Sequence, residues 1–272
     1  MAAVNMTEGG ITKHLVDYSI PLILGNMFQL TYNAVDSIIA GRFIGKEALA
    51  AEGTASPVMN IVILGISGIC MGASVLMSEF YGAGQKEKLK REMSTTVIFG
   101  CYFSVLIAIL GGFFSKPLLG VLGVPDEILG KAASYLSILF LGVPFTYFYN
   151  AVSAALKSVG DSKTPLKFLA FSSILNAVLD LIFIGGMGFG IVCSAVTTVV
   201  AEAASAFLCI TYVYRKIPML QLRHGEFNMD RQLLRQTLRY GSAAVLPAHR
   251  KAVDSGRCQS VGRGYDCGVQ RG

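Results

Sequence analysis

The chain has 272 residues, of which 53% are hydrophobic and only 15% are charged, and its mean hydropathy is +0.57. A soluble domain of this length needs a more polar surface, so the composition indicates a membrane protein. The net charge of +6 is carried by short clusters between apolar runs. That distribution is typical of membrane loops and argues against a nucleic-acid-binding groove.

A membrane-spanning helix needs about 20 mainly apolar residues, and six segments meet this requirement. They lack the alternation of a β-barrel wall, and stretches containing Gly and Pro separate them. The sequence therefore predicts an all-α polytopic membrane protein with six transmembrane helices, at about Ile20–Ala40, Pro57–Met77, Thr95–Phe114, Tyr135–Leu156, Leu166–Ile184 and Phe189–Tyr214.

Lys and Arg residues are unevenly distributed between the two ends of these helices. The N-terminal segment and the connections after the second, fourth and sixth helices hold most of them. Because cytoplasmic loops carry the excess of positive charge, the N-terminus and the segment after the sixth helix are expected in the cytoplasm, with the helices in a bacterial inner membrane. The basic cluster QKEKLKRE, residues 85–92, is interpreted as a solvated loop on that side.

These features divide the chain into four parts. They are a cytoplasmic N-terminus (1–18), a six-helix transmembrane lobe (19–214), a cytoplasmic connector that leads toward a seventh helix (215–244) and a polar tail (245–272). An amphipathic helix is expected in the connector from about Met229. The tail has no apolar run and is expected to be disordered. It is interpreted as an out-of-frame or truncated end, and the alternative is a basic tail that binds anionic lipid.

Polar residues follow one face of three predicted helices. On the first helix they fall within an arc of about 80°. The three sets are Asn26, Gln29, Asn33 and Asp36; Ser173, Asn176 and Asp180; and Ser194, Thr198, Glu202 and Ser205. A charged side chain at the bilayer centre costs on the order of 2.5–3.5 kcal/mol. The three faces are therefore expected to line a shared interior cavity.

Carboxylates together with amide and hydroxyl oxygens suit a proton or a hard cation such as sodium. Other interpretations remain open for three of the residues. Asp36 could pair with Arg42 at the membrane surface, Asp180 could lie at the interface, and Glu202 could form a hydrogen bond between helices. No nucleotide-binding, zinc-protease or serine-hydrolase motif occurs in the sequence. Neither an enzyme nor a cofactor is therefore expected, and an ion gradient would supply the energy.

Three segments resemble the MATE (multidrug and toxic compound extrusion) family of transporters. The segment IPLILGNMFQLTYNAVDSIIAGRFIGKEALAAEGTASPV resembles the family's first helix and the loop that follows it. The segment GISGICMGASVLMSEFYGAGQKEKLK resembles the family's second helix and its basic loop. The segment NAVSAALKSVGDSKTPLKFLAFSSILNAVLDLIFI resembles the family's fourth-to-fifth helix region. Together the resemblance covers residues 7–244.

The resemblance implies the N-terminal lobe of a twelve-helix transporter that expels amphipathic, often cationic compounds in exchange for sodium ions or protons. It also implies a cation site formed by Asp36, Asn176, Asp180 and Thr198, with Thr197 as the neighbouring option. The polar faces add candidates for the cavity lining, namely Asn26, Gln29, Asn33 and Glu202. The family's C-terminal lobe has no counterpart in this sequence, so the chain alone is not expected to transport.

Two other functions are compatible with the six-helix pattern. The first is a lipid-linked oligosaccharide flippase of the same superfamily. Such flippases line their cavity with Arg and Lys, which the predicted helices almost lack. The second is a truncated membrane fragment without transport activity, which the polar tail favours.

Overall fold

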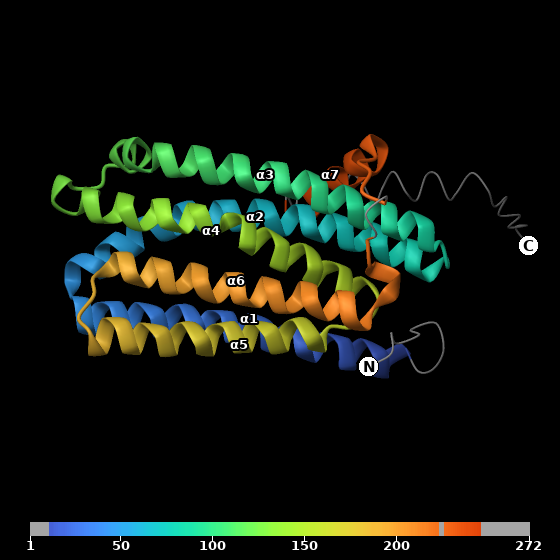
Figure 1. Ribbon diagram of the computed structural model, residues 1–272, viewed down its shortest axis with the longest axis horizontal. Helices are drawn as coiled ribbons and strands as arrows, with labels where there is room; N and C mark the ends of the chain where they lie inside the picture. Colours follow the sequence, from blue (N-terminus) through green and yellow to red (C-terminus); the bar gives the residue numbers. More distant parts are fainter. Residues whose placement is uncertain (1–10, 223–225, 246–272) are drawn as a thin grey trace, which may run out of the picture.

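The computed structural model describes residues 11–222 and 226–245. Every regular element in this part of the chain is helical, and the long helices run along the longest axis of the molecule (Figure 1). The predicted all-α fold is therefore confirmed. The tail expected from residue 245 onward lies almost entirely outside the described residues, as do the first ten residues.

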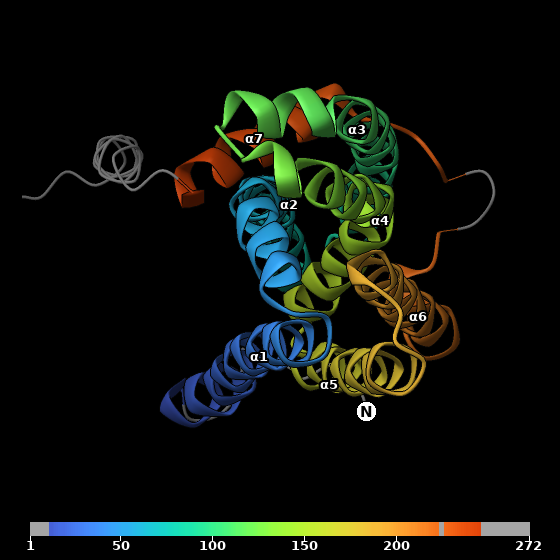
Figure 2. The same ribbon diagram turned by 90° about the vertical axis from the view of Figure 1, so that its left-hand side faces the viewer.

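The helices are α1 (Ile11–Ile39), the short π-helix η1 (Ala40–Ile44), α2 (Lys46–Gly82), α3 (Lys86–Val121), α4 (Asp126–Ser158), α5 (Lys163–Asp180), the π-helix η2 (Leu181–Gly186), α6 (Ile191–Lys216), the 3-10 turn η3 (Pro218–Leu220) and α7 (Arg231–Val245). The long helices α1–α6 run up and down the bundle in chain order, and α7 runs across it (Figure 2).

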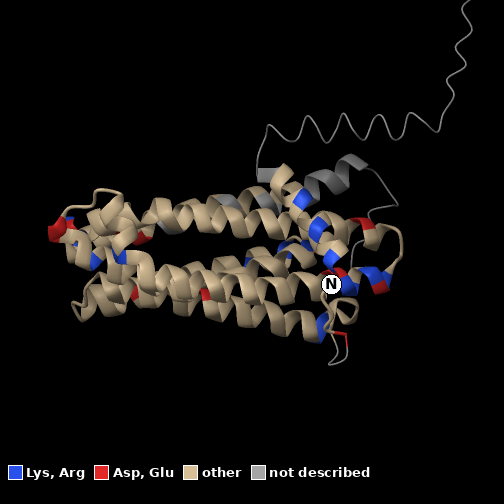
Figure 3. Ribbon diagram, turned by 90° about the horizontal axis from the view of Figure 1, so that it is seen from above, with Lys and Arg blue, Asp and Glu red and all other residues tan. Residues whose placement is uncertain are grey.

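Five helices of the described part are long and apolar enough to cross a membrane. They are α2, α3, α4, α5 together with η2, and α6. A sixth long helix, α1, has 29 residues and packs against α5 (Figure 2). The six predicted spans therefore correspond to α1–α6. Charged residues gather at the two ends of the bundle, and few interrupt its middle (Figure 3).

The prediction that residues 85–92 form a solvated loop is wrong. Lys86 to Glu92 form the first turns of α3, and Leu89 and Glu92 are buried. In the same way α2 begins at Lys46, well before the predicted start at Pro57. Hydropathy locates the apolar part of a helix and does not mark where the helix begins, so polar turns beyond the apolar run are assigned to loops.

The centre of the bundle is α4, which packs against α2, α3 and α6 (Figure 2). Its contact with α3 depends on a glycine. A Cβ atom at Gly100 would lie 1.6 Å from the ring of Tyr147, which is fully buried. The Tyr147 hydroxyl donates a hydrogen bond of 3.0 Å to the carbonyl oxygen of Thr96. The small residue therefore lets the two helices approach closely, as is common in membrane proteins.

The connector folds back onto the bundle through α7. This helix is the amphipathic helix expected from about Met229, and it begins at Arg231. The α7 backbone touches α2, because a Cβ atom at Gly72 would lie 2.1 Å from the carbonyl oxygen of Thr237. The Thr237 hydroxyl also donates a hydrogen bond of 2.6 Å to the buried carboxylate of Glu92 in α3. Two helices of the bundle therefore hold α7 in place.

Candidate functional site

The carboxyl groups of Asp36 and Asp180 lie next to each other inside the bundle, within hydrogen-bonding range. Asp36 comes from α1 near its end, and Asp180 is the last residue of α5. Both are buried, with exposed fractions of 8% and 0%. Asp36 accepts a hydrogen bond of 3.3 Å from the hydroxyl of Ser194 in α6. Three helices therefore meet at this carboxylate pair.

Two consecutive threonines of α6 complete the pair's surroundings. The Thr197 hydroxyl donates a hydrogen bond to Asp180. Thr198 interacts with Asn176, which lies one turn before Asp180 and is buried. When the Asn176 amide nitrogen faces Asp180, it donates to Oδ2 at 3.0 Å, and the amide oxygen accepts from the Thr198 hydroxyl at 3.2 Å. The sequence singled out Thr198 and kept Thr197 as an option, and both side chains contact α5.

A third carboxylate, which the sequence analysis did not single out, lies beside this pair. Glu52 in α2 is half-buried, and its Oε1 accepts a hydrogen bond of 2.7 Å from the hydroxyl of Ser37. It is close enough to act electrostatically on Asp36 and Asp180. Glu52 precedes the second predicted span and therefore looked like a loop residue. Glu52 can be recognised as a helical residue only once α2 is known to begin at Lys46, before the predicted start of the span at Pro57.

The alternative ion pair of Asp36 is wrong. Asp36 forms no ion pair with Arg42, because the ion pairs of the described part join Lys90 to Glu226 and Lys131 to Glu47. Asp180 is fully buried within the protein and bonded to Thr197. Each carboxylate instead finds its partners on a neighbouring helix, which offsets part of the cost of burying it.

A cavity of about 450 Å³ is lined by residues from α1, α2, α4, α5 and α6 and from the segment before α5, and Asp36 and Asp180 are not among its lining residues. Gln29 and Glu202 are among them. The side chain of Glu202 also accepts a hydrogen bond of 2.5 Å from the hydroxyl of Thr146, so the expected bond between helices is present. Asn26 and Asn33 belong to α1, and their side chains lie outside the described residues.

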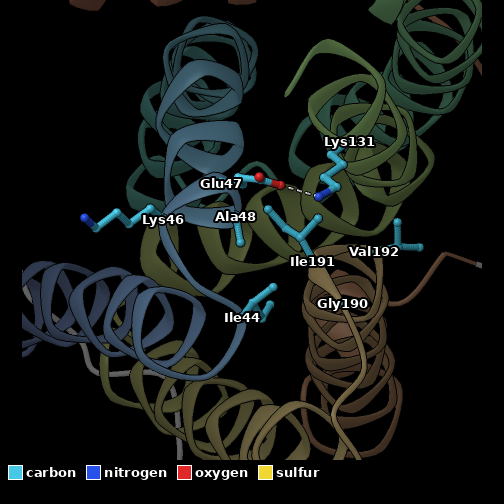
Figure 4. A pocket seen from close by; sticks show the side chains of 8 residues that line it. All are labelled: Ile44, Lys46, Glu47, Ala48, Lys131, Gly190, Ile191 and Val192. Carbon is cyan, nitrogen blue, oxygen red and sulfur yellow. Dashed lines mark hydrogen bonds and ion pairs between the residues drawn. The ribbon is translucent and has the colours of Figure 1, made fainter. Parts of the chain in front are cut away.

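A second pocket, of about 600 Å³, lies at the end of the bundle where α2, α4 and α6 begin (Figure 4). Glu47 of α2 and Lys131 of α4 form an ion pair across it. Both residues are exposed, and a solvated pair of this kind contributes little stability. The carboxylates of α1 and α5 do not line this pocket, so it is separate from the candidate cation site.

The buried cluster offers carboxylate, amide and hydroxyl oxygens to one point inside the bundle. Two adjacent carboxylates repel each other when both are ionised, and a proton or a small cation between them relieves the repulsion. No group of three or more His, Cys, Asp and Glu residues in the described part has the arrangement of a metal site. Asn176 and the threonine hydroxyls add further oxygen atoms to those of the two carboxylates, and oxygen ligands suit hard cations.

A family described as MatE matches residues 21–182 of the chain. Curated relatives include the probable multidrug resistance proteins YoeA and YpnP of Bacillus subtilis, 33% and 32% identical. The alignments cover 84% and 79% of this chain and 51% and 48% of those proteins. The multidrug export protein MepA of Staphylococcus saprophyticus is 22% identical over 88% of this chain and 53% of its own length. The chain therefore spans about half the length of the curated relatives it matches.

Solved structures of transporters share the fold. A crystal structure of a MATE mutant superimposes with a TM-score of 0.84 at 26% identity, over 96% of this chain and 58% of that one. An outward-facing multidrug resistance transporter of the MATE family gives a TM-score of 0.83 at 27% identity, over 90% of this chain and 54% of that one. An inward-facing structure gives 0.75 at 26% identity, over 84% and 53%.

Proposed function

Because the chain belongs to the MATE family of membrane transporters, we propose that it forms the N-terminal lobe of a secondary active exporter. The exporter expels amphipathic, often cationic compounds and takes up sodium ions or protons in exchange. The single observation that carries the proposal is the buried pair Asp36 and Asp180, held by Ser194 and Thr197. The multidrug resistance and export functions named for the relatives support the direction of transport.

In this proposal Asp36, Asn176, Asp180 and Thr198 hold the coupling cation. The carboxylates supply the charge, and the amide and hydroxyl oxygens replace the water that a cation loses on entering the bundle. Thr197 positions Asp180 through its hydrogen bond. Because the pair connects α1 with α5, binding and release of the cation would change how α1 packs against α5.

The cavity of about 450 Å³ is the proposed path of the transported compound. Gln29 and Glu202 line it, and Asn26 and Asn33 are proposed as further lining residues because they share the polar face of α1 with Gln29. Among the described residues that line the cavity, Lys157 is the one basic residue, which fits a cationic compound better than the pyrophosphate of a lipid-linked oligosaccharide. Drug export is therefore favoured over a flippase function.

The lobe is proposed to lie in a bacterial inner membrane with its N-terminus in the cytoplasm. The excess of Lys and Arg at that end of the bundle supports this orientation. A second lobe is the proposed partner, since the curated relatives are about twice as long as the part that matches. It would close the other side of the transport path.

An efflux assay tests the proposal. Residues 1–244 are joined to the second half of the Bacillus subtilis relative YoeA, and the hybrid is expressed in cells that lack their own drug pumps. The hybrid is expected to lower the accumulation of ethidium, and Asp36→Asn is expected to abolish this effect because the pair then loses one of its charges. Collapsing the sodium and proton gradients separately identifies the coupling ion.

The exposed residue Asp126 supplies the matched control. It lies at the start of α4, so Asp126→Asn makes the same chemical change at an exposed site and should leave efflux intact. Unchanged efflux in the Asp36→Asn hybrid, at equal amounts of protein in the membrane, would remove this residue from the coupling mechanism.

A further inference from the structure

Three arginines form one face of α7. Arg231, Arg235 and Arg239 follow one another at four-residue spacing, so they fall within an arc of about 80° on this helix. All three residues are exposed. The residues that pack against the bundle lie on the other side of the helix axis, where Thr237 and Gly241 are buried. The arginine face therefore points away from the bundle.

The acidic residues near α7 already have partners. Glu226 forms an ion pair of 2.8 Å with a lysine of α3. Asp230 accepts hydrogen bonds of 2.8 and 3.2 Å from two backbone N–H groups in the first turn of α7, as an N-cap residue does. Glu92 is fully buried against Thr237, on the side of α7 that faces the bundle. Neither ion pair of the described residues includes an arginine of α7, so its arginine face is available to a negative charge from outside the chain.

The position of α7 along α2 sets its depth in the membrane. The 37 residues of α2 span about 55 Å, whereas the hydrocarbon core of a bilayer is about 30 Å thick. When the bilayer is centred on α2, about 12 Å of the helix therefore extends beyond the core at each end. The backbone of α7 contacts Gly72, about 15 Å before the end of α2 at Gly82. This contact places α7 at the boundary between hydrocarbon and headgroups, where it runs across the bundle (Figure 2).

Apolar side chains are exposed beside the arginines. Leu238 lies next to Arg235 and Arg239 on the surface of α7, and 39% of it is exposed. Phe227 and Met229, in the segment just before α7, are exposed by 46% and 41%. At the membrane boundary such side chains enter the hydrocarbon while arginines reach the headgroups. A basic face bordered by exposed apolar residues is the pattern of a helix that lies in the membrane surface.

We propose that the arginine face of α7, formed by Arg231, Arg235 and Arg239, binds the phosphate groups of anionic phospholipids in the leaflet around this end of the bundle. A guanidinium group matches phosphate oxygens with two parallel hydrogen bonds, and basic residues close to an anionic surface are attracted to it. An acidic protein surface is the competing partner, and the depth of α7 favours lipid. The inference goes beyond the proposed export function and does not depend on it.

Fluorescence quenching of the full 272-residue chain in lipid vesicles tests the inference. The chain contains no Trp, so Leu238→Trp places a single reporter beside the arginines. The vesicles hold equal parts of phosphatidylglycerol and phosphatidylcholine, and one of the two lipids carries bromine atoms that quench a neighbouring tryptophan. A preference for phosphatidylglycerol of about fivefold or more is expected at the reporter. The preference should decrease as salt screens the charges.

Two sets of charge changes in the reporter chain separate the arginine face from net charge. Changing all three arginines of α7 to glutamine should reduce the preference to about one, because glutamine keeps the helix propensity and loses the charge. Changing them to lysine keeps the charge and should retain most of the preference. The matched control changes Lys163, Lys167 and Lys216 to glutamine, which removes the same charge from exposed positions of α5 and α6 at the same end of the bundle. This control should keep the preference.

A second reporter and a second measurement complete the test. Tyr102→Trp lies in the middle of α3, where the replaced side chain is 75% exposed, and should show no preference between the two lipids. In detergent, phosphatidylglycerol should raise the melting temperature of the unmodified chain more than phosphatidylcholine does. The variant with three glutamines should respond equally to both lipids.

Equal quenching by the two lipids in the Leu238→Trp chain would overturn the inference and point to an acidic protein surface as the partner of the arginine face. An equal loss of preference in the two glutamine sets would also overturn it, because net charge would then attract the lipid. If the Leu238→Trp chain does not fold, the melting temperatures decide, and an equal response of the unmodified chain to both lipids would contradict the inference. A hybrid transporter that fails to export ethidium would contradict the proposed export function and leave this lipid preference unchanged.

Discussion

Thr197 of α6 donates a hydrogen bond to the carboxylate of Asp180 at the end of α5. The next residue, Thr198, contacts Asn176 one turn earlier on the same helix. Two consecutive residues of α6 therefore hold two polar residues of α5, at the position where Asp36 of α1 approaches. In the proposed mechanism these hydroxyls hold Asp180 and Asn176 in place before an ion binds, which would reduce the reorganisation that binding requires.

Replacing Thr197 by valine should impair the coupling site. Valine has nearly the same shape but no hydroxyl, so Asp180 loses the hydrogen bond from Thr197 while the packing remains. We expect the hybrid transporter to need about tenfold more of its coupling ion for half-maximal ethidium export, in line with one lost charge-assisted hydrogen bond. Thr197→Ser keeps the donor and should export normally. Normal export by the valine variant would show that this bond does not position the site.

Glu52 should strengthen cation binding through its charge. It lies beside the carboxylate pair and is held by Ser37, so Glu52→Gln keeps the hydrogen bond and removes one negative charge. The affinity for the coupling ion should decrease severalfold, measured as the ion concentration that gives half-maximal export. Glu79→Gln changes an exposed glutamate near the other end of α2 and serves as the control. Equal ion dependence in both variants would rule out this role for Glu52.

The contact between α3 and α4 should depend on the missing side chain at Gly100. A methyl group there would overlap the ring of the fully buried Tyr147, so Gly100→Ala should destabilise the lobe by about 1–3 kcal/mol. Gly112 lies in the same helix, and a Cβ atom there has no neighbour within 4 Å. Gly112→Ala should therefore be neutral or slightly stabilising, because alanine favours a helix. Thermal unfolding in detergent, followed by circular dichroism, compares the two variants, and equal melting temperatures would contradict the close approach.

Gly72→Ala should loosen α7 from the bundle. Its methyl group would overlap the carbonyl oxygen of Thr237, which is part of the α7 backbone and has little room to move. Trypsin should then cut faster at the exposed arginines of α7, such as Arg231 and Arg235. Gly65→Ala, also in α2, meets nothing within 4 Å and should leave the cleavage rate unchanged. Equal cleavage of both variants would mean that α7 does not pack at Gly72.

The sequence predicts the helices well, and it places the polar residues of α5 on one face, because both follow from local spacing. Apolar runs locate the spans, and the four-residue spacing of Asn176 and Asp180 places them on one face of α5. Glu52 is missed because hydropathy places the start of the second span at Pro57, whereas α2 begins at Lys46. Whether a residue before that apolar run faces the site depends on where the helix begins, and the apolar pattern does not contain this information.

A polar face of α4 that lines the cavity of about 450 Å³ is missed for a different reason. Thr146, Asn150 and Ser153 alternate with aromatic and small residues, so the segment reads as an ordinary apolar span. Only the contacts of α4 with α2 and α6 show that this face borders a cavity while the opposite side packs in the core. The position of α7 is likewise a tertiary property. Its amphipathic pattern predicts a helix, and the glycine contact with α2 decides where that helix lies.

The claim that Asp36 and Asp180 hold the coupling ion is tested most directly by infrared difference spectroscopy of the full chain in lipid, recorded while pH or sodium concentration is stepped. The account predicts a change in the carboxyl bands as the proton or sodium ion binds. This change should be present in the unmodified chain and in Asp126→Asn, and absent in both Asp36→Asn and Asp180→Asn. A difference spectrum that persists unchanged in these two variants would contradict the account.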